Sequence, residues 1–203
     1  MAERLSALAA SYRPGSFGAT GAAGPGIVMT ERRNLAIVQV AVPADQAPAL
    51  RVGLTSALGI APPDAPNRAI SSSTATIFSV GPQRFLVVEA EQGWRNLEAV
   101  LHGALAGSGA AVTDVGSGRT VFRIAGPRTR DLLAKGSGID FHVRAFPAGA
   151  CAQGLLGHVG ALFHAVDDTP VFDLYVARSF GLTVWEWLSE SAAEFGYRVD
   201  AAA

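Results

Sequence analysis

The spacing of apolar and polar residues predicts four elements in the first half of the chain. Residues 35–42 read LAIVQVAV, a β-branched apolar run that is typical of a buried strand, and Pro43 ends it. Leucines recur every fourth residue between 45 and 58, which is the spacing of one helix face. Residues 74–80 and 84–90 flank Gly-Pro-Gln and predict a β-hairpin. Residues 94–105 gather their apolar side chains on one helical face, which predicts a second helix.

The second half repeats this order of elements. Residues 119–125 (RTVFRIA) predict a strand, and Gly126-Pro127 precedes a helix predicted over 129–135. Two strands are predicted within 151–166 and over 171–178, and a closing helix over 182–195. Each half therefore reads strand, helix, strand, strand, helix. We expect an α+β fold with mainly antiparallel sheets, made of two pseudo-repeated ferredoxin-like halves.

This pattern predicts three regions in the chain. They are a flexible N-terminal arm over residues 1–33, a first α+β half over 34–110 and a second half over 111–203. One half alone would have a small core, so we expect the halves to form one compact unit. The arm contains GSFGATGAAGPG at 15–26, which is too rich in glycine for a regular element. That segment lacks the Lys-Ser/Thr ending of a phosphate-binding loop, so a flexible connector is favoured.

Composition and charge exclude several classes of protein. The 203 residues include 16 Lys and Arg against 17 Asp and Glu, a formal net charge of −1. This balance argues against a dedicated nucleic-acid binder and against attraction to an anionic membrane. Hydrophobic residues make up 49% of the chain and charged residues 16%, so the chain can bury a core. The stretch 145–166 has no charged residue, but its glycines, proline and histidines favour strands and turns over a membrane-spanning helix.

Candidate chemical groups are few, and none forms a catalytic pattern. No two histidines have the spacing of a metal-binding helix, and the single cysteine excludes an internal disulfide and a cysteine-rich zinc site. We interpret Cys151 as a buried inert thiol and Ser117 of the Gly-Ser-Gly segment as a turn residue. We interpret the Asp167-Asp168 pair as part of a solvated hairpin turn. The sequence predicts no catalytic, cofactor-binding or metal-binding residue. The candidates considered are His102, His142, His158, His164, Cys151, Ser117, Asp167 and Asp168.

Two further groups of residues suggest binding rather than catalysis. The densest basic cluster consists of Arg119, Arg123, Arg128 and Arg130, and it could form an anion site. Arg119 and Arg123 share one face of the predicted strand. Two tryptophans of the closing helix lie two positions apart, so they cannot share a narrow face, and one is a candidate interface anchor. The two tryptophans are Trp185 and Trp187.

Motifs in the second half resemble a known family. The segment TDVGSGRTVFRIAGP at 113–127, followed by RDLL at 130–133, is similar to the opening motif of folate-dependent aminomethyltransferases, the glycine-cleavage T-proteins. The continuation resembles the gamma subunit of heterotetrameric sarcosine oxidase. It comprises KG at 135–136, IDFH at 139–142, AFPAG at 145–149, CAQ at 151–153 and FDLYVARSF at 172–180. The resemblance is strongest over 113–195 and weaker over 34–105.

This resemblance implies a bacterial, cytoplasmic assembly of alpha, beta, gamma and delta subunits. Such a complex demethylates sarcosine oxidatively to glycine, with H2O2 and either 5,10-methylenetetrahydrofolate or formaldehyde as products. FAD, FMN, NAD and tetrahydrofolate are then expected in the partner subunits, and none in this chain. The family's folate domains carry a working carboxylate in a strand that corresponds here to 160–166, which holds Phe163 and His164 and no acid. A general base must reach its proton, so we expect a non-catalytic subunit with a structural role in assembly.

Two alternatives remain open at this point. The first is a free-standing tetrahydrofolate-binding one-carbon transfer protein, whose pocket carboxylate would be Asp114, Asp167 or Asp168. The second is a module that binds an unrelated anion through Arg119 and Arg123. The first predicts measurable folate affinity, and the second predicts that removal of the two arginines abolishes binding without unfolding.

Overall fold

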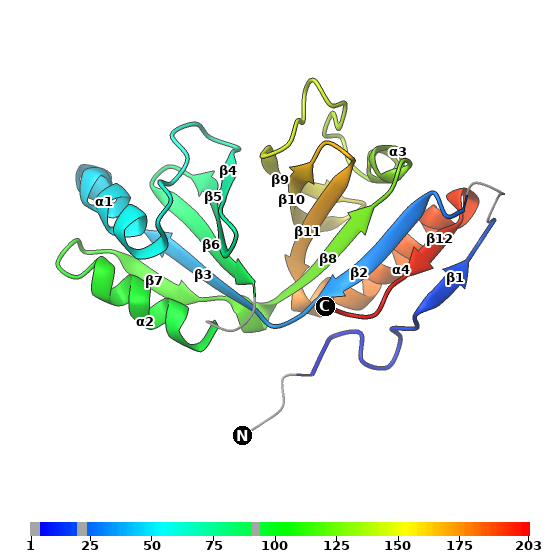
Figure 1. Cartoon of the computed structure of the whole chain (residues 1–203), viewed down its shortest axis with the longest axis horizontal. Helices are drawn as coiled ribbons and strands as arrows, with labels where there is room; N and C mark the ends of the chain where they lie inside the picture. Colours follow the sequence, from blue (N-terminus) through cyan, green and yellow to red (C-terminus); the bar gives the residue numbers. More distant parts are fainter. Residues whose placement is uncertain (1–4, 20–23, 91–93) are drawn as a thin grey trace. The chain divides into compact units, whose positions relative to one another are not determined.

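A computed structural model describes residues 5–19, 24–90 and 94–203. The chain divides into two compact units, and Figure 1 shows the elements of each. One unit consists of residues 34–117 and 149–152, and we call it the five-stranded unit after its sheet. The other consists of residues 1–33, 118–148 and 153–203, and we call it the seven-stranded unit.

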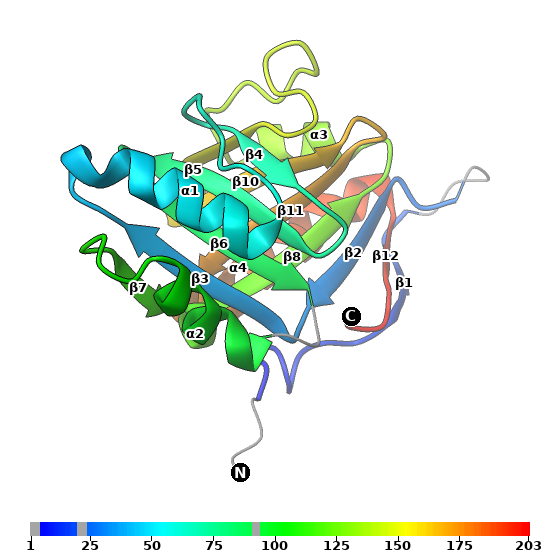
Figure 2. The same ribbon diagram turned by 60° about the vertical axis from the view of Figure 1, so that its left-hand side comes forward.

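The five-stranded unit is an antiparallel sheet with two helices on one face (Figure 2). The strands follow the order β4-β5-β6-β3-β7. A hairpin joins β5 to β6, and β3 lies between β6 and β7. Its elements are β3 (Leu35–Ala41), η1 (Ala44–Gln46), α1 (Ala47–Leu58), β4 (Ala69–Ser71), β5 (Ala75–Gly81), β6 (Arg84–Ala90), α2 (Trp94–Ala104), β7 (Ala111–Asp114) and η2 (Gly116–Gly118).

The core of this unit lies between the sheet and the two helices. Alternate residues of β3, Val38 and Val40, are buried and pack with Leu50 and Leu54 of α1. Leu101 of α2 completes the same cluster and is fully buried. The period of two in the strand and of about four in the helices is therefore what places these side chains in one core.

The seven-stranded unit has the strand order β1-β12-β2-β8-β11-β10-β9, and α4 lies behind β8 and β2 in Figure 1. Among the strand pairings with a described register, β12 with β2 is parallel and the others are antiparallel. Its elements are β1 (Gly15–Phe17), β2 (Ile27–Arg32), β8 (Arg119–Ala125), α3 (Thr129–Ala134), β9 (Cys151–Leu156), β10 (Val159–Asp167), β11 (Val171–Ala177), η3 (Arg178–Phe180), α4 (Gly181–Ala192), η4 (Ala193–Phe195) and β12 (Tyr197–Val199).

Aromatic side chains fill the core of the seven-stranded unit. Phe122 of β8 lies 5.8 Å, centroid to centroid, from Trp185 of α4. Because successive strand residues point to opposite faces, Phe122 and its neighbours i±2 face α4 and the residues between them face away from it. A second aromatic cluster joins the loop after α3 to strands β10 and β11. It consists of Phe141, Phe146, Phe163 and Phe172.

The N-terminal 33 residues differ from the flexible arm that the sequence suggested. Residues 1–4 and 20–23 lie outside the described residues, but β1 and β2 are strands of the sheet, and β2 pairs with β8 and β12. Leu8 is fully buried, and the Tyr12 hydroxyl donates to the carbonyl of Asp200 and accepts from the backbone N–H of Glu31. The expected boundary at residue 110 also differs, because β7 pairs with β3 in the five-stranded sheet.

The remaining predicted elements agree with the structure to within a few residues. Strands β3, β8 and β11, the β5–β6 hairpin and helices α1 to α4 lie where the apolar spacing predicted them. The two tryptophans of α4 do not include an exposed anchor. Trp185 is 6% exposed against Tyr12 and Phe122, and Trp187 is half-buried against Gly136. The interface that we expected at one of them therefore has to be sought elsewhere.

Candidate functional site

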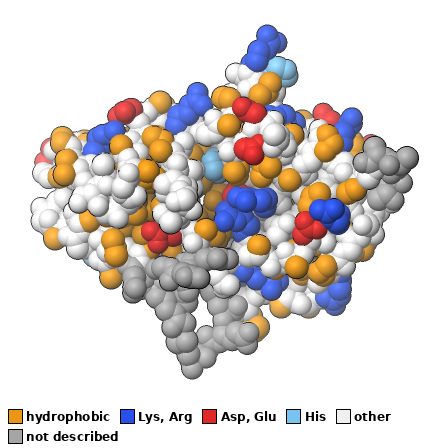
Figure 3. Space-filling model, in the orientation of Figure 1, with side chains coloured by type: hydrophobic (Ala, Val, Ile, Leu, Met, Phe, Trp, Pro, Cys, Tyr) orange, Lys and Arg blue, Asp and Glu red, His pale blue; other side chains and the backbone are white. Residues whose placement is uncertain are grey.

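A buried charge cluster lies on the face of the seven-stranded sheet that points away from α4. Asp173 of β11 is 2% exposed, and both of its carboxylate oxygens accept hydrogen bonds from Arg123 of β8, each at 2.8 Å. Arg32 of β2 donates to the same carboxylate at 2.9 Å. In Figure 3, basic side chains gather beside acidic ones over β8 and β11. The cluster thus joins three neighbouring strands through one aspartate.

Strand register explains how residues so far apart in sequence meet. Asp173 and Arg123 are Cα partners in the β11–β8 pairing, and Thr30 is the Cα partner of Arg123 on β2. Arg32 lies two residues after Thr30 and therefore on the same face. A buried carboxylate needs a partner for its charge, and here it has two guanidinium groups. The hydrogen bond to Asp173 is the main cause that raises the pKa of Arg123.

His164 of β10 adds a fourth member to this cluster. It is 4% exposed and is the Cα partner of Asp173. The pKa of His164 is lowered from 6.5 to about 4, mainly by burial, while the charge of Asp173 partly opposes this effect and those of Arg123 and Arg32 add to it. The imidazole is therefore neutral near pH 7. The segment 160–166 carries no acid of its own, but the fold brings the carboxylate of Asp173 beside it.

The depressed pKa of His164 predicts a pH dependence of stability. The unfolded chain binds this proton near pH 6.5, whereas the folded chain does so only near pH 4. The free energy of unfolding should therefore fall as the pH drops from 6.5 to 4, by about 3 kcal/mol in all. Urea titrations across this pH range should show a flatter slope for His164→Gln. His158→Gln changes an exposed histidine and should keep the wild-type slope, so equal slopes in all three proteins would refute this assignment.

The basic cluster of the sequence separates into different environments. Arg119 and Arg123 share the strand face, as predicted from their spacing. Arg128 pairs with Asp131 at 3.0 Å and lies over the ring of Phe195. Arg130 donates to the carbonyls of Phe141 and Phe146 and lies over the Phe172 ring. Each of Arg123, Arg128 and Arg130 therefore has its own partners, and the four do not form one anion site.

The other candidates of the sequence lie in turns, in loops or on the surface, except Cys151, which is buried in β9. Asp114 accepts from the backbone N–H of Gly116, Asp167 from that of Thr169 and Asp168 from that of Ala148. The bond from Thr169 confirms the turn interpretation for Asp167, whereas the bond to Asp168 comes from a loop residue that lies 20 positions earlier in the chain. Cys151 is 1% exposed, and burial raises its pKa to about 12, as expected of an inert thiol. The exposed residues of this group are His102, His142, His158 and Ser117.

Sequence reasoning singled out Arg123 but missed its partners. The available signal was a single acid, Asp173, in the middle of the apolar strand VFDLYVA. An ionisable residue at such a position is buried and must be paired. Arg32 gave no comparable signal, because it is 141 residues away in the chain. Within the described residues, no three His, Cys, Asp or Glu side chains gather in a way that could hold a metal ion.

Comparisons with known proteins agree with this fold. A family model described as "Sarcosine oxidase, gamma subunit family" matches residues 43–194. The fold is similar to a chain of the heterotetrameric sarcosine oxidase from Corynebacterium sp. U-96, with a TM-score of 0.76 and 24% identity over 88% of each chain. It is also similar to glycine cleavage system aminomethyltransferase T from Bartonella henselae, with a TM-score of 0.62 and 12% identity. That match covers 95% of this chain and 56% of the other.

A search of curated proteins returned no match to the sequence. The structural similarities confirm the predicted fold class, a mixed α+β fold dominated by antiparallel sheets.

Proposed function

Because this chain belongs to the sarcosine oxidase gamma subunit family, we propose that it is a non-catalytic subunit with a structural role in assembling a heterotetrameric oxidase. The observation that carries the proposal is the extent of the family match. Residues 43–194 include most of both compact units, from just after β3 to η4. The matched region therefore spans elements of both units and is not an isolated motif.

The charge cluster supports the non-catalytic part of the proposal. A general base needs a carboxylate or imidazole that is free to accept a proton from the substrate. Asp173 uses both oxygens to bind arginines. Asp114, Asp167 and Asp168, the acids that a free-standing folate-dependent transferase could use, all accept backbone hydrogen bonds, the first two of them within turns. The cluster is suited to holding β2, β8 and β11 together.

We place the chemistry of the complex in the partner subunits. The expected partners are alpha, beta and delta subunits, which would hold FAD, FMN, NAD and tetrahydrofolate. The reaction would convert sarcosine to glycine, with H2O2 and 5,10-methylenetetrahydrofolate or formaldehyde as products, in the bacterial cytoplasm. No helix in the described part of the chain is long and apolar enough to cross a membrane.

An apolar surface at the start of α4 is our candidate for a subunit contact. Leu5 is 65% exposed, Phe180 49% and Leu182 39%. Arg178 donates to the carbonyl of Leu5 at 2.9 Å, so the N-terminal segment lies against the turn that precedes α4. Large apolar side chains that gather on a surface are typical of interaction sites. This surface replaces the tryptophan anchor that the sequence suggested.

Purification of the untagged protein from its natural source tests the proposal. We expect the chain to elute in a complex far above its 20.9 kDa mass, with flavin absorbance and with sarcosine oxidase activity. Phe180→Ser should weaken the complex without unfolding the chain, since its side chain is half exposed. Val52→Ser changes an apolar residue of α1 that is 71% exposed and serves as the matched surface variant. Elution of wild type alone, colourless and folded, would contradict the proposal.

A further inference from the structure

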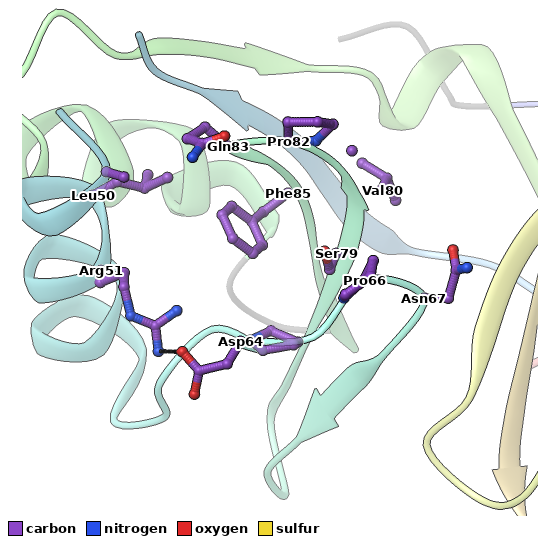
Figure 4. Close-up of a pocket in the computed structure, with 13 residues that line it drawn as sticks. Leu50, Arg51, Asp64, Pro66, Asn67, Ser79, Val80, Pro82, Gln83 and Phe85 are labelled. Carbon is purple, nitrogen blue, oxygen red and sulfur yellow. Dashed lines mark ion pairs between the residues drawn. The ribbon is translucent and has the colours of Figure 1, made fainter. Parts of the chain in front are cut away.

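A pocket of about 430 Å³ opens in the five-stranded unit (Figure 4). It lies between the first turn of α1, the proline-rich loop at 62–67 and the turn that joins β5 to β6. Small-molecule sites in proteins are concave, mostly apolar and of about 300–1,000 Å³. All of its lining residues come from one compact unit, so the pocket is a property of that unit alone.

The interior of the pocket is apolar and contains an aromatic ring. Phe85 projects toward the centre of the pocket, with Leu50 on one side and Pro66 on another (Figure 4). Phe85 is 7% exposed and Leu50 1%, so both also belong to the core and are held in place by it. A flat apolar group could pack against this ring without rearrangement of the fold.

The charged side chains at the edge of the pocket are Asp64 and Arg51, and Arg51 of α1 is the hydrogen-bond donor of the two. One terminal nitrogen donates to the carbonyl of Pro62 at 3.1 Å and lies 2.8 Å from an oxygen of Asp64. The other terminal nitrogen points toward the interior, on the side of Phe85 (Figure 4). The carbonyl of Pro62 fixes the guanidinium group, so a charged donor is already aimed into an apolar space. Such a donor favours a carboxylate, which accepts one charge-assisted hydrogen bond from the inward nitrogen and a second, parallel one when it displaces Asp64 from the other nitrogen.

Asp64 does not neutralise this arginine strongly. Its side chain is 90% exposed, and ion pairs of that kind contribute little because water and salt screen them. A carboxylate that brings an apolar ring into the pocket would compete well with Asp64. Gln83, whose φ is +47°, lies across the pocket from Arg51 and offers an amide on that side (Figure 4). The turn holds this residue in a left-handed conformation that glutamine rarely adopts.

We propose that this pocket binds a small aromatic carboxylate, with the carboxylate on Arg51 and the ring against Phe85. This inference is independent of the proposed subunit function, because it concerns one unit of the chain and its own residues. Benzoate is the probe, and benzamide, which has the same shape without the charge, is its matched control.

NMR titration of the full chain tests the proposal. Benzoate should bind with a Kd of about 0.5 mM and shift the amide signals of Gln83 and Phe85, and benzamide should bind at least about tenfold more weakly. Arg51→Gln should weaken benzoate binding by about tenfold or more. Asp64→Asn should strengthen it by about threefold, because the competing carboxylate is gone. Arg144→Gln, which changes an exposed arginine of the other unit, should have no effect.

Three results would overturn the proposal. They are no shift at Gln83 or Phe85 with about 10 mM benzoate, equal affinities for benzoate and benzamide, and an unchanged affinity in a folded Arg51→Gln variant. The Asp64→Asn variant keeps the test decisive if Arg51→Gln fails to fold, because Asp64 is exposed and its loss should leave the fold intact. An affinity for benzoate that does not rise in Asp64→Asn would then count against the proposal.

Discussion

Replacement of Asp173 by Asn is expected to lower the free energy of unfolding by about 3 kcal/mol. The change removes the single negative charge that Arg32 and Arg123 share and leaves two guanidinium groups on a largely buried sheet face. The Arg123 side chain is 38% exposed, so water relieves part of the penalty, and the loss should be at the lower end for a broken buried pair. Chemical denaturation followed by tryptophan fluorescence measures it, since Trp185 and Trp187 lie in α4 of the same unit.

A variant without any charge in the cluster distinguishes the contribution of the ion pairs to stability from the contribution of side-chain packing. The triple change Asp173→Leu, Arg32→Met and Arg123→Met replaces the ion pairs by apolar side chains of similar length. Such replacements are often neutral or stabilising, because no charge has to be removed from water. The triple variant should therefore be more stable than Asp173→Asn. A loss below about 1 kcal/mol in Asp173→Asn would show that the cluster does not hold the sheet together.

Gly126→Ala should destabilise the chain by about 4 kcal/mol. Gly126 has a φ of +115°, a conformation that residues with a side chain rarely adopt. A Cβ atom there would also lie 2.5 Å from the carbonyl oxygen of Gly26, a backbone atom that cannot turn away. The same carbonyl accepts a hydrogen bond from the N–H of Arg128. The Gly-Pro motif after β8 is thus required for the close approach of the segment that leads into β2.

Gly103→Ala is the matched control for this prediction. Gly103 lies inside α2 and is exposed, and a Cβ atom added to it would meet nothing within 4 Å. Alanine is a better helix former than glycine, so this variant should be more stable by about 0.5–1 kcal/mol. Thermal unfolding of both variants would show shifts in opposite directions. Similar shifts in both would mean that the backbone at Gly126 is free to adjust.

The fold was predictable where one face of an element is apolar and its period is intact. Strand β8 and helix α1 show such patterns, and both lie where they were expected. Strand β2 was missed because Glu31 occupies one of its buried positions, where an apolar residue would have completed the alternation. Its carboxylate accepts hydrogen bonds from Arg33, two residues later, and from Ser6, a distant residue that local spacing cannot connect to this strand. The edge strand β1 is only three residues long and gives no period at all.

The charge cluster was only partly predictable for a related reason. Arg123 attracted attention because it lies among other arginines, but its role depends on pairing with β11, 50 residues later. The register that aligns Arg123 with Asp173 follows from the burial of Phe122 and Leu174 on the other face of the sheet. Local spacing indicates which residues share a strand face. It does not indicate which strands become neighbours.

Neighbouring strands of the seven-stranded sheet are far apart in the chain, and this limits the order in which a nascent protein can fold. Residues 34–117 contain all five strands of the smaller sheet, so that sheet can form while the ribosome is still translating the rest. Strand β2 emerges before them, but its neighbours are β8, which follows, and β12, which comes last of the strands. The apolar residues Ile27 and Met29 must therefore wait for nearly the whole of synthesis before they are covered. During that interval this segment exposes apolar side chains on an unpaired strand, a state that is prone to aggregation and that chaperones protect.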